Sequence, residues 1–264
     1  MVHAMKEIQI RKNDAGQRLD RFVGKAVPLL PESLLQKYIR LKRIKRNGKG
    51  AKRDVRLVEG DVLQLYINDE FFERPTEQNA WLKIATPRLD IVYEDENILL
   101  ADKKPGVLCH SAGEWSWDTL ISNIQAYLRQ SGEWDPKAEN AFTPALCNRI
   151  DRNTGGIVIA AKNAEALRIL NDKIRDREID KAYLCVVCGR PKPAEGRLEG
   201  YLFKDAVKNQ VYVTKKPQPG AKSAATEYRT LQSRKGLSLV ECRLLTGRTH
   251  QIRAQMAAAG CPLL

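Results

Sequence analysis

The 264-residue sequence has few aromatic residues, few histidines and no long apolar run. Aromatic residues make up 6% of the chain, and histidine occurs three times. No apolar run reaches the roughly 18 residues that a membrane-spanning helix needs, and residues 1–10 lack the apolar segment of a signal peptide. We therefore expect a cytoplasmic protein that has no membrane partner.

Cysteine is also too scarce for a disulfide-stabilised protein. Six cysteines are spread over the chain, a density far below that of secreted disulfide scaffolds, so we expect them to be reduced. Cys185 and Cys188 form a Cys-x-x-Cys pattern, but they lie in the apolar run 183–188, which predicts a buried strand. Because there is no second cysteine pair and histidine is rare, we predict core packing for both residues and no metal site.

What the sequence does have is positive charge. Lysine and arginine number 45 against 32 acidic residues, which gives a net charge of +13 and a pI of about 9.5. Such a balance indicates a polyanionic partner such as nucleic acid. Residues 1–68 hold 16 lysines and arginines against 7 acids, an excess of 9, so much of the charge lies in the first quarter of the chain.

The stretch from Lys37 to Arg56 contains ten basic residues and a single acid, Asp54. It has three explanations: a solvated charged surface, a membrane-binding basic helix, or a surface that contacts nucleic-acid phosphates. A membrane-binding helix pairs its charges with large exposed apolar residues, whereas the apolar residues here are few and are needed for the core of a small domain. We therefore favour phosphate contact.

The pattern of residues 1–68 predicts a small α/β domain. Apolar residues recur at helical spacing in residues 19–26 and again in residues 34–39. The turn signal Asn47-Gly48 and the alternation of apolar residues over 63–67 predict a small sheet after the two helices.

Residues 69–87 are rich in acids and contain two prolines, which indicates a linker. In residues 88–264, many strand-like runs are separated by irregularly placed helical stretches. This order predicts an α+β domain with a mainly antiparallel mixed sheet. The expected strands are 91–93, 98–101, 156–161, 182–187, 210–213 and 237–243, and the expected helical stretches are 118–130, 164–174 and 250–259.

A polar loop around Asp151 is the first candidate site. Residues 148–156 place polar side chains and two glycines directly before the strand that begins near Ile157. From this segment alone, a turn in which Asp151 caps backbone amides is as good an explanation as catalysis. Two distant segments change the balance: one brings Tyr183 to the start of a predicted strand, and the other, residues 247–253, leads from a glycine turn into a predicted helix.

Together the three segments resemble the RluA-type pseudouridine synthases in order and spacing. The matching motifs are Arg-Ile-Asp-Arg-x-Thr-x-Gly around Asp151, Lys-x-Tyr ending at Tyr183, and Arg-Thr-His-Gln-Ile-Arg over residues 248–253. With further matches at Glu94-Asp95-Glu96 and from Lys103 to His110, the resemblance runs from about residue 88 to residue 264. Residues 15–68 resemble the S4-like RNA-binding domain, through the segments 17–22, 41–48 and 58–63.

The sequence departs from the family pattern at three places. Asn148 stands where the family usually has His, and Gly155 stands where it usually has Ser or Thr. We expect neither position to carry the bond-breaking step. Relatives usually continue beyond the position of Leu264, so we expect the catalytic domain, residues 88–264, to be truncated at its carboxyl end.

The resemblance implies an isomerase that converts uridine in structured RNA, above all large-subunit ribosomal RNA, into pseudouridine without a cofactor or a metal. It implies that Asp151 is the catalytic carboxylate and that Tyr183 lies beside the target base. Arg253, or next Arg248, is the expected arginine that keeps the carboxylate ionised and directed. Because a stacked uridine must flip out to react, Arg149 is expected to fill the vacated position.

Further RNA-binding residues are expected in both parts of the chain. The resemblance places Ile252 beneath the target base, although plain core packing explains this residue equally well. We expect a monomer, and the alternative function is a non-catalytic RNA-binding or ribosome-assembly factor. The other residues expected to contact RNA are Arg152, His250, Lys37, Arg40, Lys42, Arg43, Lys45 and Arg46.

Overall fold

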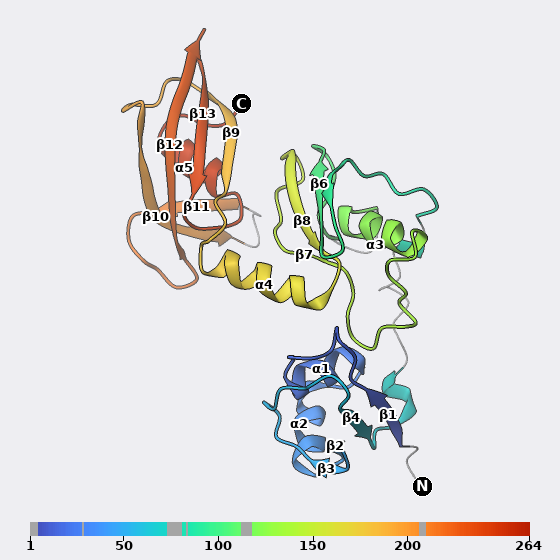
Figure 1. The fold of residues 1–264 in the computed structure, drawn as a ribbon. Helices are drawn as coiled ribbons and strands as arrows, with labels where there is room; N and C mark the ends of the chain where they lie inside the picture. The colour runs from blue at the N-terminus through green and yellow to red at the C-terminus, as the bar shows by residue number, and fades with distance from the viewer. Residues whose placement is uncertain (1–4, 28, 73–80, 83, 112–117, 206–209) are drawn as a thin grey trace. The chain divides into compact units, whose positions relative to one another are not determined.

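The computed structural model describes residues 5–27, 29–72, 81–82, 84–111, 118–205 and 210–264. The chain divides into two compact units, residues 1–171 and residues 172–264 (Figure 1). Within the described ranges, no helix has both the length and the apolar character needed to cross a membrane.

The first unit contains two sheets, with the strand orders β1-β4-β2-β3 and β5-β6-β8-β7, and every strand pairing in them is antiparallel. The last helix of this unit, α4, extends a few residues into the second unit. The elements are β1 (Lys6–Gln9), α1 (Leu19–Ala26), α2 (Glu32–Arg40), β2 (Ile44–Arg46), β3 (Lys49–Gly50), β4 (Val62–Leu65), the 3-10 helix η1 (Asp69–Phe72), β5 (Ile91–Glu94), β6 (Ile98–Lys103), α3 (Leu120–Gln130), β7 (Ala145–Leu146), β8 (Gly156–Ala161) and α4 (Ala164–Arg175).

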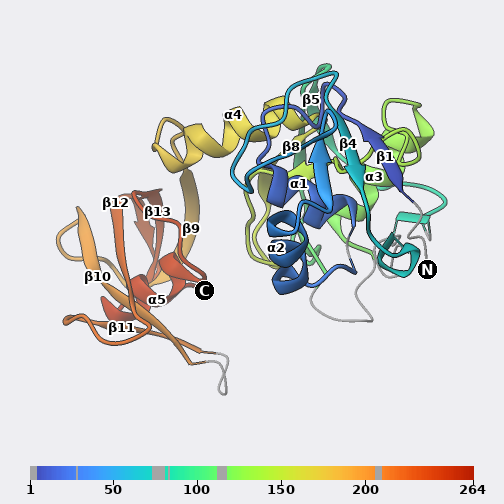
Figure 2. The same cartoon turned by 90° about the horizontal axis from the view of Figure 1, so that it is seen from below.

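The second unit contains one five-stranded antiparallel sheet, in the order β11-β10-β12-β13-β9, and helix α5, which packs against it (Figures 1 and 2). The predicted α+β architecture with mainly antiparallel sheets is confirmed. The elements are β9 (Ala182–Cys188), β10 (Glu195–Asp205), β11 (Gln210–Thr214), β12 (Lys222–Arg234), β13 (Leu237–Leu244) and α5 (Gln251–Ala258).

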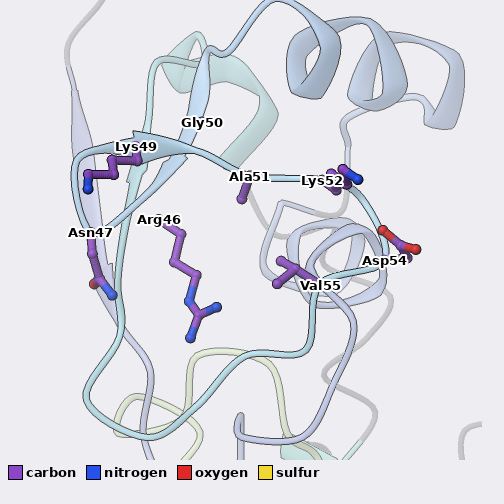
Figure 3. A pocket seen from close by; sticks show the side chains of 8 residues that line it. All are labelled: Arg46, Asn47, Lys49, Gly50, Ala51, Lys52, Asp54 and Val55. Carbon is purple, nitrogen blue, oxygen red and sulfur yellow. The ribbon is translucent and has the colours of Figure 1, made fainter.

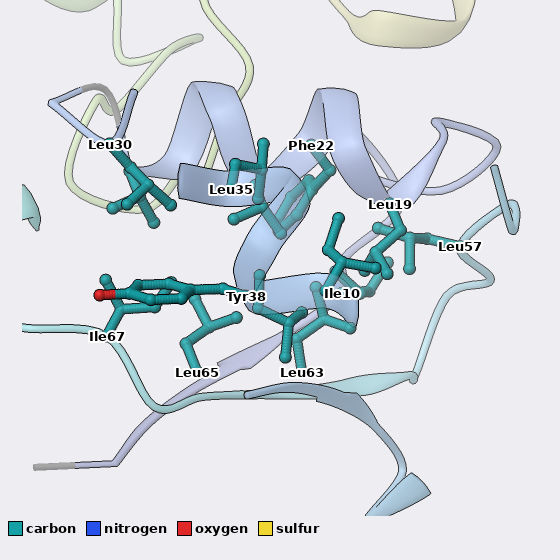
Figure 4. Close-up of a cluster of buried hydrophobic side chains, with 14 residues drawn as sticks. Ile10, Leu19, Phe22, Leu30, Leu35, Tyr38, Leu57, Leu63, Leu65 and Ile67 are labelled. Carbon is teal, nitrogen blue, oxygen red and sulfur yellow. The ribbon is translucent and has the colours of Figure 1, made fainter. Parts of the chain in front are cut away.

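In residues 5–72, α1 and α2 cover the first sheet, and an apolar core lies between the helices and the strands (Figure 4). Phe22 of α1 and Leu35 of α2 are buried there together with Leu63 and Leu65 of β4. Burial of each such side chain contributes roughly 1.5–3 kcal/mol. The apolar spacing that predicted two helices followed by a small sheet therefore marks the residues that form this core.

The hairpin between β2 and β3 turns at Asn47-Gly48, as the sequence predicted. Both residues are left-handed, with φ values of 51° and 77°, as a two-residue type I′ turn requires. The Asn47 side chain also holds the neighbouring segment, because its Oδ1 accepts a hydrogen bond from the Val62 backbone N–H at 2.8 Å and its Nδ2 donates to Asp61 at 2.8 Å.

A second apolar core surrounds α3 and β6 and includes two residues of the predicted linker. Trp81 and Ile84 are buried in it, and the Trp81 ring meets the Trp134 ring edge to face, with 5.5 Å between centroids. This part of the predicted linker is therefore packed. Residues 73–80 and 83 lie outside the described residues, and the domain boundaries stay a prediction.

The second unit contains two long strands, β10 and β12, that the sequence analysis did not predict. Two glycines interrupt β10, and β12 is composed mainly of small, polar and charged residues. Such residues have weak strand preference, so pairing on both sides decides their conformation. Helix α5 begins at Gln251, close to the predicted start.

The Cys-x-x-Cys strand, β9, is not buried in the way the apolar run predicted. β9 pairs with β13 at the end of the strand order, and its side chains alternate between the two faces of the sheet, so that Leu184 is 67% exposed whereas Val187 is buried. Cys185 and Cys188 are each half-buried. The Cys185 Sγ lies 3.9 Å from the Cys242 Sγ of the adjacent strand β13, consistent with packing.

Candidate active site

The loop that carries Asp151 joins β7 to β8. Asp151 is half-buried, and its carbonyl oxygen accepts a hydrogen bond from the Thr154 N–H at 3.1 Å, which closes a turn around it. The Asn148 side chain fastens the start of the loop to β8: its Oδ1 accepts from the Ile159 N–H at 2.8 Å and its Nδ2 donates to the Ile157 carbonyl at 3.3 Å. The loop therefore contains a turn over residues 151–154, with Asp151 at its first position.

A buried lysine at the end of β6, Lys103, is hydrogen-bonded to this loop. It is 1% exposed, and its ammonium donates to the carbonyl oxygens of Lys104 at 3.1 Å, Val107 at 2.8 Å and Arg152 at 3.0 Å. Burial lowers the pKa of Lys103, against the opposing effect of the nearby Cys109 and Asp151. The sequence analysis gave Lys103 no role. Its position two residues after Ala101, in the inward register of a predicted strand, was the available signal.

Further contacts fix the Asp151 loop against residues 104–109. The Gly106 N–H donates to the Arg152 carbonyl at 2.8 Å, and the Arg152 Nε donates back to the Gly106 carbonyl at 3.1 Å. The Cys109 thiol donates to the Ile150 carbonyl at 3.4 Å. The backbone on both sides of Asp151 is thus held by hydrogen bonds to one neighbouring segment.

The glycine at position 155 fits a close approach in the same place. A Cβ at Gly155 would lie 3.2 Å from the Pro105 Cδ and 3.5 Å from the Lys103 carbonyl oxygen. The first distance is shorter than an ordinary van der Waals contact, so a side chain at this position would need Pro105 to give way by a few tenths of an ångström. Gly155 therefore lets this loop pack directly on the proline.

In the second unit, Tyr183 lies near the start of β9, half-buried and opposite Cys242 of β13, and it packs against the apolar cluster of this unit. Ile252 of α5 packs against the same cluster. Both side chains therefore take part in core packing. For Ile252, the sequence analysis gave core packing as an equally good explanation.

The Arg248 to Arg253 segment forms the end of a loop and the first turn of α5. The Arg248 Nε donates to the Ser223 carbonyl at 3.0 Å. His250 precedes the helix in a left-handed conformation, with φ of 52°, and Arg253 is exposed on the helix. The predicted site residues therefore form two groups, one in each unit. Arg149, Asp151 and Arg152 lie in one loop of the first unit, and Tyr183 and residues 248–253 lie in the second unit, where Tyr183 and Ile252 pack against the same apolar cluster.

A model of the RNA pseudouridylate synthase family matches residues 97–258, more than half of the chain. The chain belongs to this family. An uncharacterized RNA pseudouridine synthase of Mycoplasma genitalium is 33% identical over 249 residues, which cover 93% of this chain and 76% of that protein. The predicted enzyme class, an RNA pseudouridine synthase and hence an isomerase, is confirmed.

Other relatives agree with the RluA-type assignment. Ribosomal large subunit pseudouridine synthase C of Escherichia coli (strain K12) is 28% identical over 261 residues, 98% of this chain and 78% of that protein. Ribosomal large subunit pseudouridine synthase D of Borreliella burgdorferi is 28% identical over 267 residues, 100% of this chain and 78% of that protein. The solved structure of human RNA Pseudouridylate Synthase Domain Containing 4 is 22% identical and has a TM-score of 0.54 over 71% of this chain and 70% of that one, which supports the predicted fold.

Residues 1–96 of the pseudouridine synthase lie outside the family match, so the S4-like assignment of residues 1–68 stays a prediction. Lys37 and Arg40 of α2 are exposed, as is Lys42. The other three predicted cations are more restricted. They are Arg43, whose guanidinium lies 5.1 Å from the Tyr38 ring centroid, Lys45, whose ammonium lies 5.2 Å from the Tyr66 ring centroid, and Arg46, whose Nε donates to Asp61 at 2.6 Å.

A pocket of roughly 560 Å³ opens beside the β2–β3 hairpin of the pseudouridine synthase (Figure 3). Lys49 and Lys52 line it together with Arg46, and Asp54 is the acid at its edge. The sequence analysis counted Lys49 and Lys52 in the basic stretch but did not select them as binding residues. Among the described residues, no cluster of three or more histidines, cysteines or carboxylates is arranged to hold a metal ion.

Proposed function

We propose that this pseudouridine synthase acts on uridines of large-subunit ribosomal RNA and that Asp151 is its catalytic carboxylate. The observation that carries the assignment is the fixed backbone around Asp151, in which Cys109 donates to Ile150 and Lys103 donates to Arg152. A reacting group needs such support, because small errors in its position cost rate. The names of the two ribosomal relatives support the substrate, and the net charge of +13 supports a large RNA.

The reaction breaks the bond between N1 of uracil and C1′ of ribose, turns the base and forms a bond from C5 to C1′, while the proton of C5 is lost and N1 gains one. Asp151 either attacks the sugar or removes a proton from it, and both roles need the ionised carboxylate. We assign Arg253 first, and Arg248 second, to orient that carboxylate. Tyr183 is assigned a place beside the base, where its hydroxyl can transfer the later proton.

RNA binding has to offset the cost of flipping the uridine, a few kcal/mol. We assign Arg149 to the vacated position in the stack, with Arg152 and His250 on the neighbouring backbone and Ile252 beneath the base. The exposed cations of α2 and the hairpin pocket are assigned to phosphates, which contribute affinity without sequence preference. We also propose that the protein is a monomer and that it acts in the cytoplasm. Light scattering of the purified protein measures its molar mass and so tests the monomer.

The test uses ribosomal RNA from a strain that lacks the enzyme. The wild-type protein is expected to introduce pseudouridine at defined positions, and Asp151→Asn is expected to lower the rate by on the order of 10³-fold. Asp135→Asn, which changes an exposed acid of the same unit, is the matched control and should retain full rate. Modification that survives Asp151→Asn sinks the catalytic assignment. If the protein modifies transfer RNA and leaves ribosomal RNA unmodified, the proposed substrate is wrong.

The second candidate, an RNA-binding or ribosome-assembly role, is favoured by the charge excess in residues 1–68. Asp151→Ala separates the two functions. For the enzyme, this variant loses modification but keeps salt-dependent RNA affinity, because phosphate contacts dominate binding. A wild-type protein that binds ribosomal RNA and never modifies it supports the second candidate.

A further inference from the structure

A buried glutamine connects the loop that carries Arg248 to the sheet beneath it. Gln251 is 2% exposed, and its Oε1 accepts hydrogen bonds from the Thr246 hydroxyl at 2.8 Å and from the Arg248 N–H at 3.0 Å. Its Nε2 donates to the Ala225 carbonyl at 3.0 Å and to the Thr226 hydroxyl at 2.8 Å. All four hydrogen-bonding positions of the amide are therefore used.

Other bonds join the same loop to β12 but converge on this amide. The Thr246 hydroxyl, which donates to Gln251, accepts from the Ala225 N–H at 3.0 Å. The Leu245 N–H donates to the Ala225 carbonyl at 3.1 Å. Gln251 thus shares a partner with each of these two bonds.

A second buried glutamine lies one helical turn further along α5 and serves a different purpose. Gln255 is 3% exposed; its Oε1 accepts from the Thr226 hydroxyl at 2.6 Å, and its Nε2 donates to the carbonyls of Leu198 at 2.9 Å and Ala224 at 3.3 Å. These bonds attach α5 to β10 and β12. None of the hydrogen bonds described for Gln255 reaches the loop before the helix.

The network acts beside one further bond from this loop to β12, in which the Arg248 Nε donates to the Ser223 carbonyl at 3.0 Å. The helix has no side-chain hydrogen bond at its N-cap, and His250 there is left-handed. The apolar cluster of this unit is small and consists of Val187, Tyr228, Val240, Cys242, Met256 and Cys261. A fully satisfied buried polar network gives one defined arrangement, whereas loss of one member leaves buried groups unpaired.

We propose that Gln251 is a positioning residue of the pseudouridine synthase. Its amide sets the path of residues 246–250 and with it the direction of Arg248 and the start of the helix that bears Arg253. The inference rests on the proposed function, in which these two arginines serve the reaction of Asp151. It adds a residue that acts through the arginines and does not touch the RNA.

The test compares Gln251→Met with Gln255→Met, two isosteric changes in one network. Both are expected to lower the melting temperature by similar amounts. Gln251→Met is expected to lower kcat on ribosomal RNA by on the order of 100-fold with KM unchanged, as a misplaced arginine predicts, and Gln255→Met by less than about threefold. Amide hydrogen exchange at Arg248 should accelerate in the first variant only.

Thr246→Val keeps the inference testable if Gln251→Met does not fold. It removes one hydroxyl between Ala225 and Gln251, and kcat is expected to fall by about tenfold, with a smaller loss of stability than in Gln251→Met because fewer hydrogen bonds are lost. Equal kcat for the Gln251 and Gln255 variants, or an unchanged kcat for Thr246→Val, overturns the inference. Asp151→Asn and Arg253→Met, measured in parallel, distinguish failure of the inference about Gln251 from failure of the proposed function. If these two variants remain active, the proposed function is wrong.

Discussion

The two segments assigned to the active site are held by side chains of opposite kinds. Behind the Asp151 loop, three carbonyl oxygens converge on one point, and Lys103 meets them with an ammonium that can only donate. Behind the Arg248 loop, an N–H, a carbonyl and two hydroxyls converge, and Gln251 meets them with an amide that donates and accepts. The mixture of hydrogen-bond donors and acceptors around each position decides which side chain can satisfy it.

Burial of the Lys103 ammonium and burial of the Gln251 amide differ in their free-energy cost. A buried ammonium loses its hydration, and that loss must be offset by its three short hydrogen bonds and by nearby negative charge. A buried amide carries no net charge and needs only its four partners. The Asp151 loop is therefore the segment that is more sensitive to removal of its support.

The largest expected effect is on stability, from Lys103→Met. This change removes the three hydrogen bonds of the buried ammonium and takes the Lys103 donor from the Val107 carbonyl, while the Arg152 and Lys104 carbonyls keep the N–H groups of Gly106 and Val107. It should lower the free energy of unfolding by roughly 3 kcal/mol, more than the roughly 2 kcal/mol expected for Gln251→Met. Chemical denaturation measures both. The control is Lys104→Met, whose lysine is exposed and pairs with Asp90 and Asp102, so a much smaller loss is expected. Equal losses at Lys103 and Lys104 would break the comparison.

A third buried support is charged as well, and it should respond to pH where the glutamine does not. Burial opposes ionisation of Asp61, but hydrogen bonds from Arg46, the Val58 N–H and Asn47 outweigh it and hold the pKa of Asp61 below its usual value. A lowered pKa stabilises the fold above the ordinary value of 3.8 and loses that contribution as pH falls through the folded value.

In Asp61→Asn, the protein should therefore lose stability at neutral pH, by about 1 kcal/mol or more, and should lose less on acidification than the wild type. Unfolding followed between neutral and acid pH measures the difference. Gln251→Met is the contrasting variant, with a loss that is the same at every pH. A parallel pH dependence for wild type and Asp61→Asn contradicts the role given to this carboxylate.

A smaller effect is expected where the Asp151 loop packs on Pro105. Gly155→Ser adds a Cβ 3.2 Å from the proline Cδ, so a loss of about 1 kcal/mol is expected if the proline ring shifts only partly. Serine is one of the two residues that the family resemblance leads us to expect at this position, so activity should persist. A thermal melt and a rate measurement suffice. A gain in stability means that the ring moves without cost.

The smallest effect on stability is expected at the exposed cations of the hairpin pocket. Lys49→Gln with Lys52→Gln should change unfolding by less than about 0.5 kcal/mol. It should reduce the slope of log RNA affinity against log salt concentration by about 1 to 2 and leave kcat unchanged. Filter binding over a range of salt concentrations measures the slope. An unchanged slope shows that the pocket does not meet phosphates.

Much of the fold follows from local pattern. The helices of residues 19–40 and the Asn47-Gly48 turn were predicted because apolar spacing and left-handed turn residues are local signals. The strands β10 and β12 were not, because their small and polar residues become strands only through pairing with distant partners.

The residues of the candidate site likewise fall into those that the sequence indicated and those that it did not. Motifs indicated Asp151, Tyr183 and the two arginines, whose assignment stays a prediction. The residues that support them, Lys103 and Gln251, were quoted within motifs but given no role. The inward register of Lys103 was a signal of its burial. The bonds from Lys103 to Arg152 and from Gln251 to Ala225 and Thr226 join segments far apart in the chain, so local spacing does not predict these partners.

The Asn47-Gly48 turn has a chemical consequence for the ageing of the protein. Asparagine followed by glycine deamidates readily, because glycine does not shield its own backbone nitrogen from attack on the side-chain amide, and asparagine is among the thermolabile residues. Here the product would be a carboxylate facing Asp61, in place of an amide that donates to it. The new carboxylate would repel Asp61 and add a negative charge to the basic hairpin, while its oxygen still accepts the hydrogen bond from the Val62 N–H. Old preparations should therefore bind RNA less tightly than fresh ones.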